Sequence, residues 1–196
     1  MEHRTRPGSQ GRGDVNRLRS WLRAVLARRR DVFTLLVPVP EADSPLEAAG
    51  APRGEEMPRH VTLLFPFRPA GGVTDHTVAE LSELLGRFRS FAFRLARTGR
   101  FPGVLYLEPE PAARFRDLTE ALVARWPESL PYEGAYDEVV PHLTVIDGGA
   151  EADGLEAEVV RRLPIDAVAG EVWLLRQHRG RWGVRARFPL AASASG

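Results

Sequence analysis

One short pattern occurs twice in the chain, as His-Val-Thr at residues 60–62 and as His-Leu-Thr at residues 142–144. Side chains on a strand alternate between its two faces, so each histidine would share a face with its threonine. A neutral imidazole can accept a proton near neutral pH and a charged one can donate a proton. A threonine hydroxyl can donate a hydrogen bond to a phosphoryl oxygen without adding negative charge. The repeated pattern therefore predicts a phosphoesterase site with four catalytic residues, His60, Thr62, His142 and Thr144.

These side chains suit distinct roles if the two copies meet at one phosphate. One histidine would activate water and the other would protonate the departing sugar oxygen, while Thr62 and Thr144 bind the non-bridging oxygens. The sequence leaves open which histidine is the base. Because the two imidazoles would titrate as a coupled pair, we expect a bell-shaped pH profile.

Several other chemistries are excluded by the composition. The chain has no cysteine, so disulfides, thiolate nucleophiles and cysteine-ligated zinc are ruled out. It has no H-E-x-x-H or H-x-x-x-H spacing for a metal and no G-x-x-x-x-G-K-[ST] loop for ATP. We therefore expect no cofactor and no metal.

The N-terminal part differs in charge from the rest of the chain. Residues 1–30 hold nine arginines against two acidic residues, a balance of +7, and the remainder has a balance of −6. Residues 1–13 are polar and rich in Gly and Arg, which predicts a disordered lead. Residues 14–30 predict a basic amphipathic helix, which either contacts RNA or packs its apolar stripe on the domain or on a second subunit. That stripe comprises Val15, Leu18, Leu22, Val25 and Leu26.

The remaining pattern predicts an α+β fold in two similar halves. It indicates one domain at 31–190, followed by a flexible tail at 191–196. No apolar run is long enough to span a membrane and no secretion signal is present, so we expect a cytoplasmic protein. We also expect a monomer, and the sequence leaves the oligomeric state open. Strands are predicted near 32–39, 60–65, 91–96, 104–107, 139–146, 168–175 and 182–188, and helices near 44–49, 74–88, 111–127 and 155–163.

The two motifs in their context, H-V-T-L-L-F-P-F and P-H-L-T-V, resemble the paired motifs of the two-histidine (2H) phosphoesterase superfamily, which includes the 2′-5′ RNA ligases and cyclic nucleotide phosphodiesterases. The similarity runs over residues 31–190 and includes G-R-F-P-G-V-L-Y-L, V-W-L-L and R-W-G-V-R-A-R-F-P-L. It implies two pseudo-symmetric sheet-and-helix lobes around a central cleft, no metal, and opening of a 2′,3′-cyclic phosphate on a nucleotide or RNA end to a 2′-phosphate. The alternatives are 2′-5′ RNA ligation or 2′-5′ phosphodiester cleavage, and a non-catalytic nucleotide- or RNA-binding protein of the same fold.

A few residues around the motifs keep two interpretations. Some RNA-acting members of the superfamily have an arginine or aromatic group soon after the second motif, whereas Ile146, Asp147 and Gly148 stand there in this chain, which argues against long RNA substrates. Arg59 and Arg68 flank the first motif and either neutralise phosphate or are solvated. Four aromatic residues either stack on a nucleobase or pack in the core, namely Phe101, Tyr106, Tyr136 and Trp182.

Overall fold

The computed structural model describes residues 31–54, 57–135, 139–147 and 149–193. The predicted lead at 1–13, the predicted helix at 14–30 and Tyr136 lie outside these ranges. Within them, eight strands form one sheet in the order β6-β3-β4-β5-β2-β1-β7-β8, and neighbouring strands are antiparallel. The strands are β1 (Asp31–Pro38), β2 (His60–Phe67), β3 (Phe91–Phe101), β4 (Val104–Glu110), β5 (Leu143–Asp147), β6 (Ile165–Ala169), β7 (Glu171–His178) and β8 (Arg181–Pro189).

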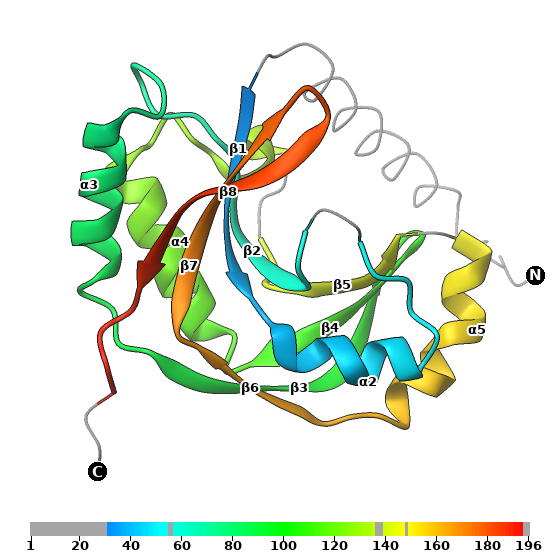
Figure 1. Cartoon of the computed structure of the whole chain (residues 1–196). Coiled ribbons are helices and arrows are strands. Elements are labelled where there is room, and N and C mark those ends of the chain that lie inside the picture. The colour runs from blue at the N-terminus through cyan, green and yellow to red at the C-terminus, as the bar shows by residue number, and fades with distance from the viewer. Residues whose placement is uncertain (1–30, 55–56, 136–138, 148, 194–196) are drawn as a thin grey trace, which may run out of the picture.

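The sheet curls, and its helices lie on opposite sides of the molecule (Figure 1). Helices α3 (Asp75–Leu85) and α4 (Ala113–Arg125) lie together on one side, and α5 (Gly149–Val160) lies on the other. A short helix α2 (Asp43–Ala48) follows β1, and the 3-10 turns η1 (Pro40–Ala42) and η2 (Pro131–Gly134) complete the described elements. The predicted α+β fold is confirmed, and its two halves meet where β5 pairs with β2 in the middle of the strand order.

Apolar side chains on the helix-covered face of the sheet form the main core. Phe115 of α4 packs edge-on against Phe91 and Phe93 of β3, with ring centroids 5.2 and 5.1 Å apart. Thr119, also on α4, donates a hydrogen bond to the Leu63 carbonyl of β2 at 3.0 Å. Leu63 and Phe115 belong to the same core cluster, so α4 lies on the side of β2 that carries Leu63.

The start of α3 follows the sequence signal for a helix N-terminus. The Thr74 hydroxyl accepts a hydrogen bond from the Thr77 amide at 3.3 Å, and the Thr77 hydroxyl accepts one from the Thr74 amide at 3.2 Å. This reciprocal capping satisfies two amides that the first helical turn leaves without partners.

Cross-strand pairs between β1 and β2 show which side chains share a face of the sheet. Leu36 pairs with Thr62, and directly opposite residues of an antiparallel pair point to the same side. We call this side the motif face. Two irregularities in the β1–β2 register follow, and Phe65 then packs with Val32 in a small hydrophobic cluster separate from the main core. Because Val32 and Leu36 are four residues apart on one strand, Phe65 also belongs to the motif face.

The predicted strand at 168–175 is wrong. The structure divides this run at Gly170 into β6 and β7, which lie at an edge and near the opposite end of the sheet. The run 168–175 is apolar on both sides of the break except at Glu171, so the pattern gave no signal of the break apart from the glycine. The predicted strand at 139–146 begins later than expected, at Leu143, since Pro141 has no amide to donate to a ladder.

Candidate active site

The two copies of the repeated motif lie side by side on β2 and β5. Val61 pairs with Leu143 in antiparallel register. The same register places Thr62 opposite His142 and His60 opposite Thr144, all on the motif face. Diagonal neighbours in such a pair have Cα atoms about 7–8 Å apart, which is the relation between the two histidines. The four predicted residues are therefore brought together as neighbours within one sheet.

Each histidine is held by the same backbone contact. The His60 Nδ1 lies 2.7 Å from the Pro58 carbonyl oxygen, and the His142 Nδ1 lies 2.8 Å from the Val140 carbonyl oxygen. A carbonyl only accepts hydrogen bonds, so Nδ1 carries the proton in both rings. The Nε2 of each ring is then unprotonated in the neutral form, and it becomes a proton donor when the ring is charged.

The surroundings favour the neutral form of both imidazoles. Loss of hydration on burial lowers the pKa of His60 and that of His142, and the hydrogen bond to the backbone carbonyl opposes this shift in each case. The charge of His142 lowers the pKa of His60 further. The two rings are thus close enough to interact electrostatically, as the strand register requires.

The two hydroxyls of the motifs are available for a ligand. Thr62 is partly buried and Thr144 is exposed. Within the described residues neither hydroxyl has a side-chain hydrogen bond to another protein group. Two donors on the same face as two imidazoles can therefore bind oxygens of one small anion.

Two aromatic residues hold the His142 ring. Phe101 and Tyr106 stack on each other with ring centroids 4.3 Å apart, and their centroids lie 5.1 and 5.3 Å from that of His142. Tyr106 pairs with Thr144 across β4 and β5, so its ring lies on the motif face. Of the two interpretations for these aromatics, the structure supports packing, and the surface that they pack against is a motif histidine.

Gly99 makes this packing possible. It pairs with Tyr106 across β3 and β4, and a Cβ at Gly99 would overlap the ring and hydroxyl of Tyr106. The tyrosine therefore lies across the strand at a position where every other residue type would displace it.

The variant Gly99→Ala should move Tyr106 and loosen His142. We expect unfolding to become easier by about 1–3 kcal/mol, the usual cost of overpacking, and the ring resonances of His142 to shift in NMR spectra. Chemical denaturation and a histidine-detected NMR spectrum measure the two effects. In a Tyr106→Leu background the same glycine substitution should cost much less. An unchanged stability for Gly99→Ala alone would contradict the packing argument.

The two arginines that flank the first motif are engaged elsewhere. Arg59 is buried, donates hydrogen bonds to the carbonyls of Ala51 and Pro52 at 3.2 and 3.4 Å, and lies 3.8 Å from Asp43. Arg68 forms an ion pair with Glu133. Arg59 thus stabilises the loop that precedes His60 through two backbone carbonyls. This role differs from both phosphate neutralisation and solvation, which the sequence suggested.

The other aromatic and histidine side chains contact groups outside the two motifs. Trp182 packs beside Phe65, with centroids 6.4 Å apart. Trp173 is only partly buried, and the Arg187 guanidinium lies over its ring, 4.3 Å from the centroid. His76 is on α3 with its side chain 82% exposed, and His178 pairs with Asp31 at the end of β7.

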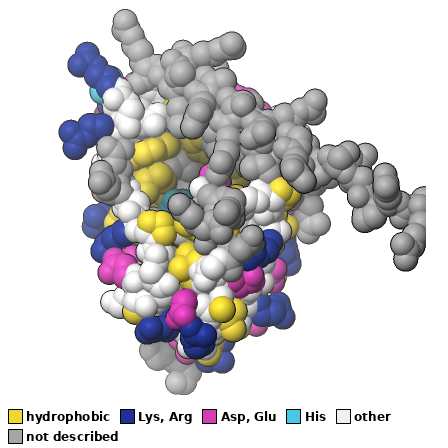
Figure 2. All heavy atoms as spheres, turned by 90° about the vertical axis from the view of Figure 1, so that its right-hand side faces the viewer, with side chains coloured by type: hydrophobic (Ala, Val, Ile, Leu, Met, Phe, Trp, Pro, Cys, Tyr) yellow, Lys and Arg dark blue, Asp and Glu magenta, His cyan; other side chains and the backbone are white. Residues whose placement is uncertain are grey.

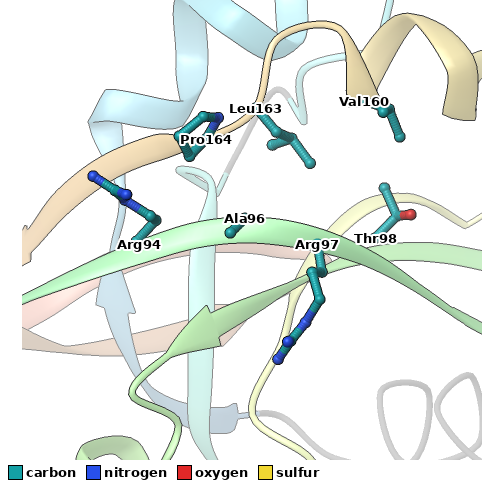
Figure 3. Close-up of a pocket in the computed structure, with 7 residues that line it drawn as sticks. All are labelled: Arg94, Ala96, Arg97, Thr98, Val160, Leu163 and Pro164. Carbon is teal, nitrogen blue, oxygen red and sulfur yellow. The ribbon is translucent and has the colours of Figure 1, made fainter.

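A groove of about 470 Å³ lies away from the motifs. Its lining residues come from β3, from the end of α5 and from the segment between α5 and β6, and Arg97 points away from it (Figure 3). The Arg94 guanidinium at its end is occupied by Asp166, at 2.7 and 3.1 Å. We therefore assign the chemistry to the motif face and not to this groove.

In the ranges that the structure describes, no group of three or more His, Cys, Asp or Glu side chains is arranged to hold a metal ion. Among the same residues, no helix is long and apolar enough to cross a membrane.

Comparison with known proteins shows the family to which this chain belongs. The family model of the 2′-5′ RNA ligase superfamily matches residues 12–181. The chain belongs to the 2′-5′ RNA ligase superfamily. No curated protein sequence matches it significantly.

Several solved structures are similar to this chain over nearly the full length of the solved protein. E. coli LigT in its apo form is 22% identical, with 82% of this chain and 98% of that chain covered and a TM-score of 0.52. E. coli LigT complexed with 3′-AMP is 19% identical, with 83% and 99% covered and a TM-score of 0.54. A protein described as a phosphoesterase is 19% identical, with 82% and 99% covered and a TM-score of 0.52. The recognition of a 2H phosphoesterase-like chain from its motifs is thereby confirmed.

Proposed function

We propose that this superfamily member is a metal-independent phosphoesterase that hydrolyses 2′,3′-cyclic phosphates of nucleotides or RNA ends to 2′-phosphates. The observation that carries the proposal is the antiparallel pairing of the two motifs, because it sets two imidazoles and two hydroxyls on one face. His60, Thr62, His142 and Thr144 are the proposed catalytic residues. Family membership supports phosphoesterase chemistry in general.

The reaction consumes one water and needs one proton acceptor and one proton donor. The neutral histidine takes a proton from water through Nε2 as the water oxygen attacks phosphorus. The bond from phosphorus to the 3′ oxygen breaks, and the charged histidine gives its Nε2 proton to that oxygen. Because both rings hold the same tautomer, either one can serve as the base. After the reaction the base is charged and the acid is neutral.

The threonines complement the charge that this step develops. Thr62 and Thr144 donate hydrogen bonds to the non-bridging oxygens, where negative charge concentrates in the transition state. A neutral hydroxyl suits this position, since a carboxylate would repel the phosphate. Crystal structures of E. coli LigT complexed with 3′-AMP and with phosphate support a nucleotide phosphate as the ligand class.

The pH dependence should be bell-shaped with its maximum on the acidic side. The active enzyme holds one proton on the histidine pair, and burial lowers the pKa of both imidazoles from the ordinary 6.5. The singly protonated pair is therefore most populated below pH 6.5, and kcat/KM, which reports the free enzyme, should peak there. A bound phosphate stabilises the imidazolium, so the kcat profile should lie at higher pH than that of kcat/KM. Initial rates from pH 4.5 to 8.5 test this, and a kcat/KM maximum above pH 7 would contradict it.

The decisive experiment is a substrate panel in EDTA. It should contain 2′,3′-cyclic mononucleotides, an oligonucleotide ending in a cyclic phosphate and a 2′-5′-linked dinucleotide, each with wild type and His142→Ala. We expect turnover of the cyclic phosphates by wild type only, with the phosphate on the 2′ oxygen by ³¹P NMR. Turnover of the 2′-5′ dinucleotide alone would assign the alternative reaction. Tight binding of all ligands without turnover would indicate a non-catalytic binder.

A further inference from the structure

A row of side chains crosses the motif face through the proposed site. Directly opposite residues of antiparallel strands point to the same side, so the row can be followed from strand to strand. Thr62 of β2 is opposite Leu36 of β1, which is also opposite Trp173 of β7. Trp173 is in turn opposite Arg187 of β8. Since neighbouring strands are about 4.8 Å apart, the backbone of Trp173 lies about 10 Å from that of Thr62 along the row.

On the other side of Thr62 the row continues through His142 to β4 and β3. The register of β4 against β5 places Glu108 opposite His142, and Glu108 is opposite Arg97 of β3. The Arg97 guanidinium lies 3.5 Å from the Glu108 carboxylate and also forms an ion pair with Glu110. Two carboxylates therefore accompany the cation at this end of the row, and they disfavour the binding of a phosphate there.

The cation at the β8 end of the row has a different environment. The exposed Arg187 guanidinium lies 4.3 Å from the centre of the Trp173 ring, and the indole N–H of Trp173 donates a hydrogen bond to Glu171 at 2.6 Å. Within the described residues Arg187 forms no ion pair, whereas Arg185 on the same strand is paired with Asp75 at 2.7 Å. The ring thus holds the guanidinium by a cation–π contact and leaves its N–H donors for an anion.

An RNA end supplies phosphates beyond the one that reacts. A 2′,3′-cyclic phosphate stands at the 3′ end of a chain, so the other phosphates lie on the 5′ side of the terminal nucleotide. On the side of the molecule shown in Figure 2, a histidine is recessed among hydrophobic side chains, and several basic side chains lie toward the margin. A chain that leaves the site toward β8 would meet Arg187, whereas a chain that leaves toward β3 would meet Glu108 and Glu110.

We propose that Arg187, held by Trp173, binds the phosphodiester that precedes the terminal nucleotide of an RNA substrate. This inference rests on the proposed function, because it takes the terminal cyclic phosphate to lie at Thr62 and His142. It names the substrate class as an RNA end of two or more nucleotides, and the chain runs from the site across β1 toward β7 and β8. A guanidinium suits this role, since its planar fork can donate two hydrogen bonds to one phosphate.

The test compares two substrates that differ by one nucleotide, a 2′,3′-cyclic mononucleotide and a dinucleotide that ends in the same cyclic phosphate. Wild type should have the higher kcat/KM on the dinucleotide. Arg187→Gln should lower that value by about 10-fold, the lower end for a hydrogen bond to a charged group, and should leave kcat/KM on the mononucleotide unchanged. Equal losses on both substrates, or a wild type without preference for the dinucleotide, would overturn the proposal.

Three further variants separate the geometry from simple charge. Arg187→Lys keeps the charge without the planar fork, so it should recover only part of the loss. Trp173→Leu removes the ring under the guanidinium and should lower kcat/KM on the dinucleotide alone, by less than Arg187→Gln does. The matched control is Arg185→Gln, which removes the same charge from an arginine paired with Asp75 and should affect neither substrate. A control variant that loses as much as Arg187→Gln would refute a specific subsite.

Binding measurements distinguish a failure of this subsite from a failure of the proposed reaction. Calorimetry with the mononucleotide and dinucleotide that end in a 2′-phosphate gives Kd without turnover. Arg187→Gln should weaken binding of the dinucleotide by about 10-fold, with a smaller difference at high salt because the guanidinium is exposed. If this result holds and no cyclic phosphate is hydrolysed, the reaction is wrong and the subsite stands. If the dinucleotide binds wild type no more tightly than the mononucleotide, the subsite is wrong, whatever the kinetics show.

Discussion

Replacement of His60 or His142 by alanine should lower turnover of a 2′,3′-cyclic nucleotide by about 100- to 10,000-fold, the usual contribution of a general acid or base. Each substitution removes the only Nε2 that the motif presents, and the neighbouring hydroxyls cannot replace it near neutral pH. KM should change much less than kcat, since both threonines still bind the phosphate. Steady-state kinetics on purified variants gives both quantities.

The appropriate control is a histidine that has no place in the site. His76 lies on α3 with its side chain 82% exposed, so His76→Ala should retain wild-type kinetics. The double variant His60→Ala/His142→Ala should be little worse than either single variant, because the two rings act as one unit. If turnover largely survives either single substitution, the assignment of acid and base to this pair fails.

The variant Thr62→Val should lower kcat by about 100-fold or more, which is the lower end of the range for loss of one hydrogen-bond donor to a transition-state oxyanion. Valine keeps the shape of threonine and removes the donor. Thr62 is partly buried whereas Thr144 is exposed. Water can replace a hydroxyl more easily at the exposed position, so Thr144→Val should have the smaller effect.

Serine provides the matched control at both threonine positions. Thr62→Ser and Thr144→Ser keep the donor and should recover most of the lost kcat. The pH at which kcat/KM is maximal should stay unchanged in all four variants, because the histidines are intact. A valine variant with normal kcat would show that the hydroxyl at that position does not contact the phosphate in the transition state.

The sequence was sufficient to find the four motif side chains and the face that they share. Both inferences rest on local rules, namely the residue types and the alternation along a strand. The pairing of β2 with β5 was not predictable in this way. The sequence around Val61 and Leu143 carries no signal that these two residues lie opposite each other. The sequence predicted that the two motifs meet, and the structure shows that they do so on adjacent strands of one sheet.

The support around His142 also escaped prediction. Phe101 and Tyr106 reach this ring only because β4 pairs with β3 on one side and with β5 on the other. The one available signal was a glycine at 99 a few residues before the aromatic Tyr106, and its meaning depends on a strand register that the sequence does not give. The burial of Arg59 was equally hidden, because its carbonyl partners lie in a loop without a regular pattern.

The pairing of Val61 with Leu143 has a further consequence for how the protein could fail. Both side chains are 0% exposed, and a slip of β5 by one residue against β2 would send His142 and Thr144 toward the interior. Such a misaligned chain would have to bury an imidazole and a hydroxyl without partners while exposing leucine and valine. The four motif side chains should therefore reach their common face together when β2 and β5 pair during folding. Molecules with a shifted register should have no catalytic activity, not a reduced one.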